Sequence, residues 1–259
     1  MIVPEKFLKS LADDDERIFA RHIIDLYELC EKRHSPTFSS FMDMRRRVVC
    51  EELLSLIKAD GYAFFGGYEN AERTAVGFFP EYSEPDESDF PICCVKYCFR
   101  KSDELSHRDI LGALMSLRIK REMTGDILIG EGKAEVMVCN TVAGDAEGIV
   151  KIGRIGVSSS VIDRPDIIRK ESFQEISGTV SSMRLDCIAA LAMNVSREKA
   201  SAALKGERVA VNYRTVTDND SRISEGDIIS VRGSGKFIVR EIGGETRKGR
   251  IHIILAKYV

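Results

Sequence analysis

Apolar side chains recur every three or four positions through most of residues 13–58, which is the spacing of one face of an α-helix. His34-Ser35-Pro36 interrupts this pattern, so we expect two N-terminal helices, the second over roughly 42–58. Arg45-Arg46-Arg47 lies near the start of the second helix, where cations oppose the helix dipole. Either a bound anion or a solvated run of charge accounts for this triplet.

Residues 61–79 alternate between apolar runs and glycine, which predicts two short strands at 61–65 and 74–79. The Gly66-Gly67 pair between them is followed by Tyr68-Glu69, whereas a phosphate-binding loop requires Lys-Ser or Lys-Thr before a helix. We therefore exclude a nucleotide phosphate site here. We expect the aromatic rings of this region to lie in the core rather than to stack on bases; they are Phe64, Phe65 and Tyr68.

The next segment, from Pro91 to about Ser160, alternates in the order β-α-β-β-α-β. The expected strands are 92–99, 126–129, 134–138 and 154–160, and the expected helices are 109–119 and 141–151. This order is typical of a ferredoxin-like, RRM-like domain, although the aromatic RNA-binding motif of RRM domains is absent. Asp126 follows Gly125 at a strand start, where we expect a polar, exposed side chain.

Residues 183–205 have the pattern of two helices joined by a short turn. Ser196 occupies the N-cap position of the second helix, where its hydroxyl accepts a first-turn N–H. Arg197 and Lys199 lie in that first turn, and Arg184 opens the preceding helix. Because free N–H groups and the helix dipole favour anions, these three cations predict a phosphate-binding corner.

A strand pair follows, with Val209 and Val211 alternating along the first strand and Gly226-Asp227 leading into a second over 228–232. Asn212-Tyr213 occupies the turn after the first strand. Tyrosine tolerates positive φ poorly, which argues against a tight type I′ turn at this point.

Formal charge divides unevenly along the chain. Residues 183–259 hold 14 Lys and Arg against 9 Asp and Glu, a net of +5, whereas the remainder holds 24 against 32, a net of −8. The overall charge of −3 is the sum of two opposite parts. This asymmetry predicts a nucleic-acid-binding face on the C-terminal part.

Composition limits the remaining classes of protein. The 259 residues suffice for two or three modest domains, and no apolar run approaches the roughly 18 residues of a membrane span. The N-terminus lacks the features of a signal peptide, so we expect a cytoplasmic protein. The seven cysteines are odd in number and lie in apolar contexts, which favours reduced thiols over disulfides.

Neither metal binding nor catalysis finds support in the sequence. Cys93, Cys94 and Cys98 share one predicted strand, on which Cys93 faces away from the other two. A zinc site commonly needs a second close pair of ligands, and only Cys139 is a further candidate. The four histidines are dispersed, and no cofactor motif is present. We therefore expect no catalytic residue, no metal and no cofactor.

Several ordered motifs resemble the YlmH-type S4-domain proteins of bacteria. They are Phe65-Gly-Gly-Tyr-Glu-Asn-Ala-Glu-Arg73, Asp109–Leu117, Lys120-Arg121-Glu122, Gly125-Asp126-Ile127, the helix-turn-helix and strands of 183–232, Val231–Phe237 and Lys248-Gly-Arg-Ile251. The resemblance covers about residues 60–259. It implies an α+β protein with an N-terminal helical segment (1–60), an RRM-like domain (61–180), and an S4 (αL-type) RNA-binding domain with a C-terminal β-hairpin (181–259).

The resemblance also implies a function. It indicates a non-catalytic, monomeric RNA-binding protein that contacts rRNA and tRNA on the large ribosomal subunit, in ribosome-associated quality control of stalled peptidyl-tRNA, with another quality-control factor as a further partner. Arg118 stands where the family is expected to have glycine. The implied RNA-binding residues are Arg184, Ser196, Arg197, Lys199, Lys205, Arg208, Asn212 and Arg214, with Lys120 and Arg121 as a second contact.

An alternative class is an RNA-modifying enzyme that an S4 domain directs to its target. Arg184-Leu185-Asp186 is similar to the catalytic motif of pseudouridine synthases, although it begins a predicted helix. A C-terminal S4 domain is also similar to tyrosyl-tRNA synthetases, whose nucleotide-binding motifs are missing here.

Overall fold

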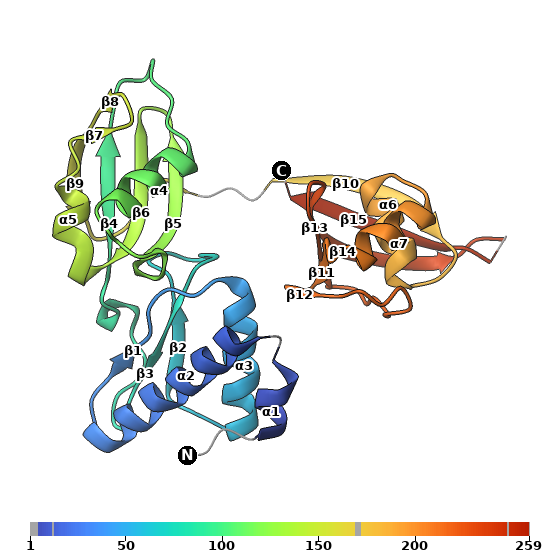
Figure 1. Ribbon diagram of the computed structural model, residues 1–259, viewed down its shortest axis with the longest axis horizontal. Coiled ribbons are helices and arrows are strands. Elements are labelled where there is room, and N and C mark those ends of the chain that lie inside the picture. Colours follow the sequence, from blue (N-terminus) through green and yellow to red (C-terminus); the bar gives the residue numbers. More distant parts are fainter. Residues whose placement is uncertain (1–4, 12, 169–171, 248, 259) are drawn as a thin grey trace. The chain divides into compact units, whose positions relative to one another are not determined.

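A computed structural model describes residues 5–11, 13–168, 172–247 and 249–258 (Figure 1). The chain forms two compact units, Met1–Arg169 and Lys170–Val259. Both contain helices and antiparallel sheets, which confirms a mixed α/β protein. The division lies before the boundary expected at residue 180, because strand β10 (Phe173–Val180) pairs along its whole length with β15 (Ile251–Tyr258). Lys248, the first residue of one family motif, lies outside the described residues.

The N-terminal part of the first unit packs helices on a small sheet. Both expected helices are confirmed, and a short helix precedes them: α1 (Glu5–Ser10), α2 (Asp14–Arg33) and α3 (Met44–Ile57). The Asp13 carboxylate accepts the Glu16 amide and the Asp43 carboxylate accepts the Arg46 amide, so aspartates cap both longer helices. The expected strands are also present in an antiparallel sheet of order β1 (Thr37–Phe38), β3 (Ala75–Phe78) and β2 (Tyr62–Phe65). A buried cluster that includes Ile23, Leu53 and Phe78 joins these layers.

The arginine triplet of α3 has partners within the protein. Arg45 Nε and Nη2 donate to the carboxylate of buried Glu16 at 2.6 and 3.0 Å. Arg47 pairs with Glu51 at 2.9 Å, and the Arg46 guanidinium lies 5.4 Å from the Phe19 ring centroid. Each arginine of the triplet therefore has a partner within the protein, and for Arg45 this partner is a buried carboxylate.

The rest of the first unit is a four-stranded antiparallel sheet in the order β5 (Thr124–Gly130), β6 (Lys133–Cys139), β4 (Ile92–Cys98) and β9 (Ser158–Ile162). Helices α4 (His107–Ser116) and α5 (Ala143–Glu147) share one cluster with this sheet, through Ile110, Leu114 and Ala146. The second helix is shorter than expected and ends at Gly148, and residues 151–156 form a small hairpin, β7 (Lys151–Ile152) and β8 (Ile155–Gly156), before the last strand begins. Short 3-10 turns are η1 (Glu87–Asp89), η2 (Arg121–Met123) and η3 (Asn140–Val142).

Neighbouring cysteines of β4 alternate as expected. Cys93 packs in the cluster beneath the two helices, whereas Cys94 packs on the opposite face with Phe41 and Met137. The aromatic rings predicted for the core are half-buried and pack against three buried clusters; they are Phe64, Phe65 and Tyr68.

Arg118 adopts the left-handed conformation that normally favours glycine, with φ +63°. It follows the C-cap Leu117, and its amide donates to the Met115 carbonyl at 2.9 Å. We expect Arg118→Gly to stabilise the first unit by up to about 1 kcal/mol, because the left-handed conformation costs an L-residue roughly that much. Ala113→Gly, in the middle of α4, should instead destabilise it by about 1 kcal/mol. Urea unfolding of both variants measures this difference, and an Arg118→Gly variant as unstable as Ala113→Gly would contradict it.

The second unit is a six-stranded antiparallel sheet with two helices on one face (Figure 1). The strand order is β10, β15, β14 (Gly235–Glu245), β13 (Ile228–Val231), β11 (Val209–Val211) and β12 (Arg214–Thr215). Helices α6 (Leu185–Met193) and α7 (Arg197–Lys205) form the connection between β10 and β11. Their apolar sides share a core with the sheet, which contains Ile188, Leu204, Phe237, Val239, Ile253 and Leu255.

The turn between β11 and β12 corrects the sequence prediction. Asn212 and Tyr213 both have positive φ, 47° and 64°, and Val211 pairs directly with Arg214. This is the geometry of a two-residue type I′ turn. The Asn212 side chain explains this turn. Its Nδ2 donates to the Asp227 carboxylate at 2.8 Å, and its Oδ1 accepts the backbone amide of Ile228 at 2.9 Å. Tertiary bonds at the first position thus outweigh the poor fit of tyrosine at the second.

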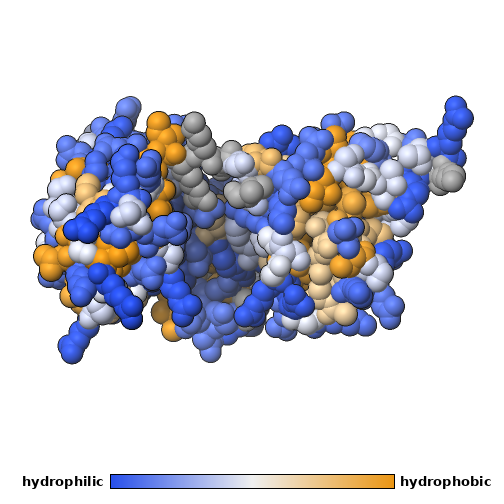
Figure 2. Space-filling model, turned by 90° about the horizontal axis from the view of Figure 1, so that it is seen from above, coloured by the Kyte–Doolittle hydropathy of each residue, from blue (hydrophilic) through white to orange (hydrophobic). Residues whose placement is uncertain are grey.

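Hydrophilic residues alternate with smaller apolar patches on the face of each unit shown in Figure 2. Among the described residues, no helix has the length and apolar character needed to cross a membrane.

Candidate nucleic-acid interface

The turn between α6 and α7 lies where the sequence predicts a phosphate-binding corner. Asn194 ends α6 in the left-handed conformation, φ 52°. Ser196 then caps α7, and its hydroxyl accepts the Lys199 amide at 3.4 Å, which confirms the predicted N-cap. Arg197 and Lys199 lie in the first turn and are exposed. The amides of this turn point out of the helix end, where the helix dipole favours an anion.

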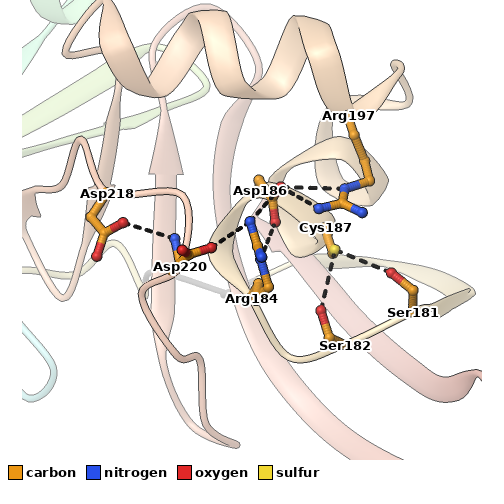
Figure 3. A network of polar contacts seen from close by, with 8 residues as sticks. All are labelled: Ser181, Ser182, Arg184, Asp186, Cys187, Arg197, Asp218 and Asp220. Atoms are coloured by element: carbon orange, nitrogen blue, oxygen red, sulfur yellow. Dashed lines mark hydrogen bonds and ion pairs between the residues drawn. The ribbon is translucent and has the colours of Figure 1, made fainter.

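Beside this corner, the buried carboxylate of Asp186 accepts hydrogen bonds from both Arg184 and Arg197 (Figure 3). Asp186, in the first turn of α6, is only 5% exposed. Its Oδ2 accepts Arg197 Nη2 at 2.6 Å and Nε at 3.3 Å. Arg184 Nε lies 3.2 Å from Oδ1 on the same carboxylate, and a second arm of Arg184 pairs with Asp220. The network therefore crosses from the loop before β13 to the start of α7.

Opposing effects set the charge state of Asp186. Burial by itself raises the pKa of this carboxyl, but hydrogen bonds from Arg197, Cys187 and Arg184 bring the pKa below its ordinary value. The hydrogen bond between Arg197 and the Asp186 carboxylate in turn raises the pKa of the Arg197 guanidinium. Because Asp186 stays ionised, it orients two guanidinium groups whose side chains remain 40% and 53% exposed, those of Arg184 and Arg197. A planar guanidinium fixed in this way is well suited to a phosphate.

Two hollows flank the segment between β10 and α6. One, of about 290 Å³, is lined by Arg197 and Arg250 among other residues; the other, of about 660 Å³, is lined by Arg184 and Arg222. Ser181 borders both hollows. Sequence analysis missed Asp186, Arg222 and Arg250 as parts of this site. Asp186 belongs to the Arg184-Leu185-Asp186 motif and Arg250 to the motif that ends at Ile251, but only the tertiary structure brings these two residues and Arg222 to one site.

The structure does not bring all the predicted residues of this unit together. Lys205 is exposed at the end of α7. Arg208 donates to the Arg232 carbonyl at 2.9 Å and lines a different hollow. Both polar atoms of the Asn212 side chain, Nδ2 and Oδ1, make hydrogen bonds within the protein. Arg214 is half-buried in β12.

Lys120 and Arg121, the second predicted RNA contact, lie in the first unit and differ in how far their side chains are engaged by the protein. Lys120 is exposed and lies 3.7 Å from Glu122. Arg121 instead donates through Nη1 to the carbonyls of Thr124 and Gly125 at 2.7 and 3.1 Å. Burial lowers the pKa of Arg121. Lys120 is thus the more accessible cation of the pair.

Asp126 is buried, with 8% of its surface exposed, which corrects the expectation of an exposed side chain. Its carboxylate accepts the Tyr68 hydroxyl at 2.8 Å and the amides of Glu72 and Arg73 at 2.7 and 3.2 Å. A Cβ added at Gly66 would meet the Arg73 carbonyl oxygen at 2.3 Å. The segment of residues 65–73 is therefore held closely around the Asp126 carboxylate.

The described residues contain no cluster of three or more His, Cys, Asp or Glu side chains placed to hold a metal ion. Burial raises the pKa of the Cys94 thiol to about 12 and that of Cys139 to about 11. Thiols with such pKa values are poor nucleophiles at neutral pH.

Comparisons with known proteins identify the family of the chain and place a putative RNA-binding domain in the first unit. A family model described as the putative RNA-binding domain in YlmH matches residues 85–164. Ribosome-associated protein quality control protein P2 of Bacillus subtilis (strain 168) is 34% identical over 241 residues, which span 91% of this chain and 93% of that protein. The solved structure of cell division protein ylmH from Streptococcus pneumoniae is similar with a TM-score of 0.51 and 26% identity, covering 60% of this chain and 94% of the other. The chain therefore belongs to the YlmH family of proteins with a putative RNA-binding domain.

Proposed function

We propose that this protein is a non-catalytic RNA-binding factor that contacts rRNA and tRNA on the large ribosomal subunit. Its role is in ribosome-associated quality control of stalled peptidyl-tRNA, in the cytoplasm, as a monomer that works with another quality-control factor. The relative named for ribosome-associated quality control matches along 91% of the chain, which supports this role for the protein as a whole.

One observation carries the RNA-binding part of the proposal. Arg184 and Arg197 are held side by side by one buried carboxylate, next to the N-terminal end of α7. Oriented guanidinium groups and first-turn amides both favour phosphate oxygens. Lys199 adds an exposed ammonium to the same turn.

We assign the two α/β domains by their topology. The sheet order β5-β6-β4-β9, with α4 and α5 in one core cluster, supports a ferredoxin-like, RRM-like domain. The α6–α7 corner packed on a sheet supports an S4 domain in the second unit. The helical segment is then residues 1–60, which contributes strand β1 to a small sheet and shares a buried cluster with the strands β2 and β3 that follow it.

The geometry of Asp186 favours binding over the alternative of a pseudouridine synthase-like enzyme. A catalytic aspartate must reach the substrate. Asp186 is buried, and its oxygens accept hydrogen bonds from Arg184 and Arg197. In this chain the aspartate of the synthase-like motif, Asp186, orients two arginine side chains.

RNA binding by separate fragments tests which unit carries the main contact. We expect residues 172–259 to bind tRNA nearly as well as the full chain, and residues 1–168 to bind poorly at physiological salt, because residues 172–259 have 14 Lys and Arg against 10 Asp and Glu and residues 1–168 have 22 against 30. Fluorescence anisotropy titrations of both fragments measure this. Since the family model places a putative RNA-binding domain at 85–164, tight binding by the first fragment would move the main site there.

A further inference from the structure

The sheet of the second unit has a face opposite α6 and α7 with a composition of its own. The helices pack on the face that contains Phe237, Val239, Ile253 and Leu255. Side chains alternate along a strand, so Lys236, Ile238, Ile254 and Tyr258 project from the opposite face. All four are half-buried. Both helices described in this unit pack on the first face, which leaves this second face to the strands themselves.

Aromatic rings and cations alternate across this second face. Phe173 on β10 pairs with Tyr258 on β15, and their ring centroids are 4.8 Å apart. Lys236 Nζ lies 4.5 Å from the Tyr258 ring centroid and 5.3 Å from that of Tyr213. The Arg240 guanidinium lies 4.8 Å from the Phe173 ring. Three rings and two cations thus form a continuous half-exposed strip.

A basic hollow adjoins the strip and shares Lys236 with it. The hollow has a volume of about 440 Å³ and is also lined by Arg208 and Arg232, with Glu207 as its acidic side chain. Three residues on the second face of the sheet also line the hollow; they are Ala210, Thr215 and Ser230. Positive charge therefore predominates at the end of the strip.

We propose that this face is a stacking surface for single-stranded RNA, with bases on Phe173, Tyr213 and Tyr258 and phosphates near Arg208 and Arg232. Single-stranded nucleic acids are commonly bound by aromatic rings beside a cationic groove, because every base has a π face and every linkage a phosphate. The proposal rests on the proposed function and adds a second RNA surface, on the opposite side of the sheet from the Asp186 network. A protein partner would equally cover the rings, but the cations of the hollow match RNA better.

A tryptophan reporter tests the surface directly, because the chain has no tryptophan of its own. In the full-length Tyr258→Trp variant we expect fluorescence to be quenched by a single-stranded RNA of about twelve nucleotides. The same strand annealed to its complement should quench it much less. Tyr82→Trp, at a position 74% exposed in the first unit, is the matched control and should not respond. Unchanged fluorescence of the Tyr258→Trp variant at saturating single strand overturns the proposal.

A second variant separates failure of this surface from failure of the proposed function. Phe173→Leu combined with Tyr258→Leu keeps apolar packing but removes two rings, and we expect the Kd for the single strand to rise at least about fivefold. Thermal unfolding checks that the sheet is intact. If this variant binds the single strand like the wild type while Arg197→Ala binds tRNA more weakly, the stacking surface is wrong and the proposed function stands. If the wild type binds neither RNA, both are wrong.

Discussion

Replacing Asp126 by alanine is expected to lower the free energy of unfolding of the first unit by about 3 kcal/mol. The buried carboxylate accepts hydrogen bonds from the Tyr68 hydroxyl and from the amides of Glu72 and Arg73. Hydrogen bonds to a charged acceptor contribute roughly 1.5–3 kcal/mol each, and the donors would remain in a largely buried site. The loop of residues 65–73 should therefore loosen from β5.

Urea unfolding of the full chain measures this effect. Asp145→Ala, which removes an exposed aspartate from α5, should change the unfolding midpoint little and is the matched control. Asp126→Asn should lie between the two, because an amide oxygen still accepts hydrogen bonds but lacks the charge. Equal midpoints for Asp126→Ala and Asp145→Ala would show that Asp126 does not hold the loop.

Removing both network arginines should have the largest effect on RNA binding. We expect Arg184→Ala combined with Arg197→Ala to weaken tRNA binding roughly tenfold or more at physiological salt. Each phosphate contact contributes about 0.9 to the slope of log affinity against log salt, so the slope should fall by roughly 1.8. The single Arg197→Ala variant should lose about half of that slope.

The control for charge is a double alanine variant at Arg100 and Arg154, two exposed arginines of the first unit. It makes the same change in net charge away from the network. Should the guanidinium groups serve only to hold Asp186, the Arg184 and Arg197 variant would unfold at lower urea while its salt slope equalled that of the wild type. Filter-binding titrations over a range of salt concentrations distinguish the two results.

Local features of the sequence were sufficient for α2, α3, α4, α6 and α7 and for the α7 cap, but not for α1 or for the short extent of α5. Ser196 as an N-cap depends only on its own backbone and the next three residues, so spacing alone predicts it. The burial of Asp126 was not predictable in this way, because its partners Tyr68 and Arg73 lie more than fifty residues earlier in the chain. Asn212 shows the same limit, since bonds to residues of β13 and the preceding turn hold a conformation that Tyr213 disfavours.

The candidate site shows this division most clearly. The cations of α7 were evident from sequence, but their neighbour Asp186 drew notice only as part of a catalytic-looking motif. Its role follows from the α6–α7 turn, which brings Arg197 within 2.6 Å of its carboxylate. Arg250 reaches the same region from the start of β15, where its guanidinium donates to the Thr179 carbonyl at 2.6 Å. Arg250 lies near Thr179 only because β10 and β15 pair in the folded sheet.

Sedimentation with ribosomal subunits tests the central proposal most directly. In a sucrose gradient of cell extract, we expect the protein to travel with large subunits that retain tRNA, and less with intact translating ribosomes. The Arg184 and Arg197 double alanine variant should remain near the top of the gradient. A Lys120→Ala variant, which spares the internal hydrogen bonds of Arg121, should weaken subunit association yet still bind short isolated RNA, because two linked contacts raise affinity through effective concentration. Wild-type protein that stays at the top of the gradient, or that binds vacant and tRNA-bearing subunits equally, would contradict the proposal.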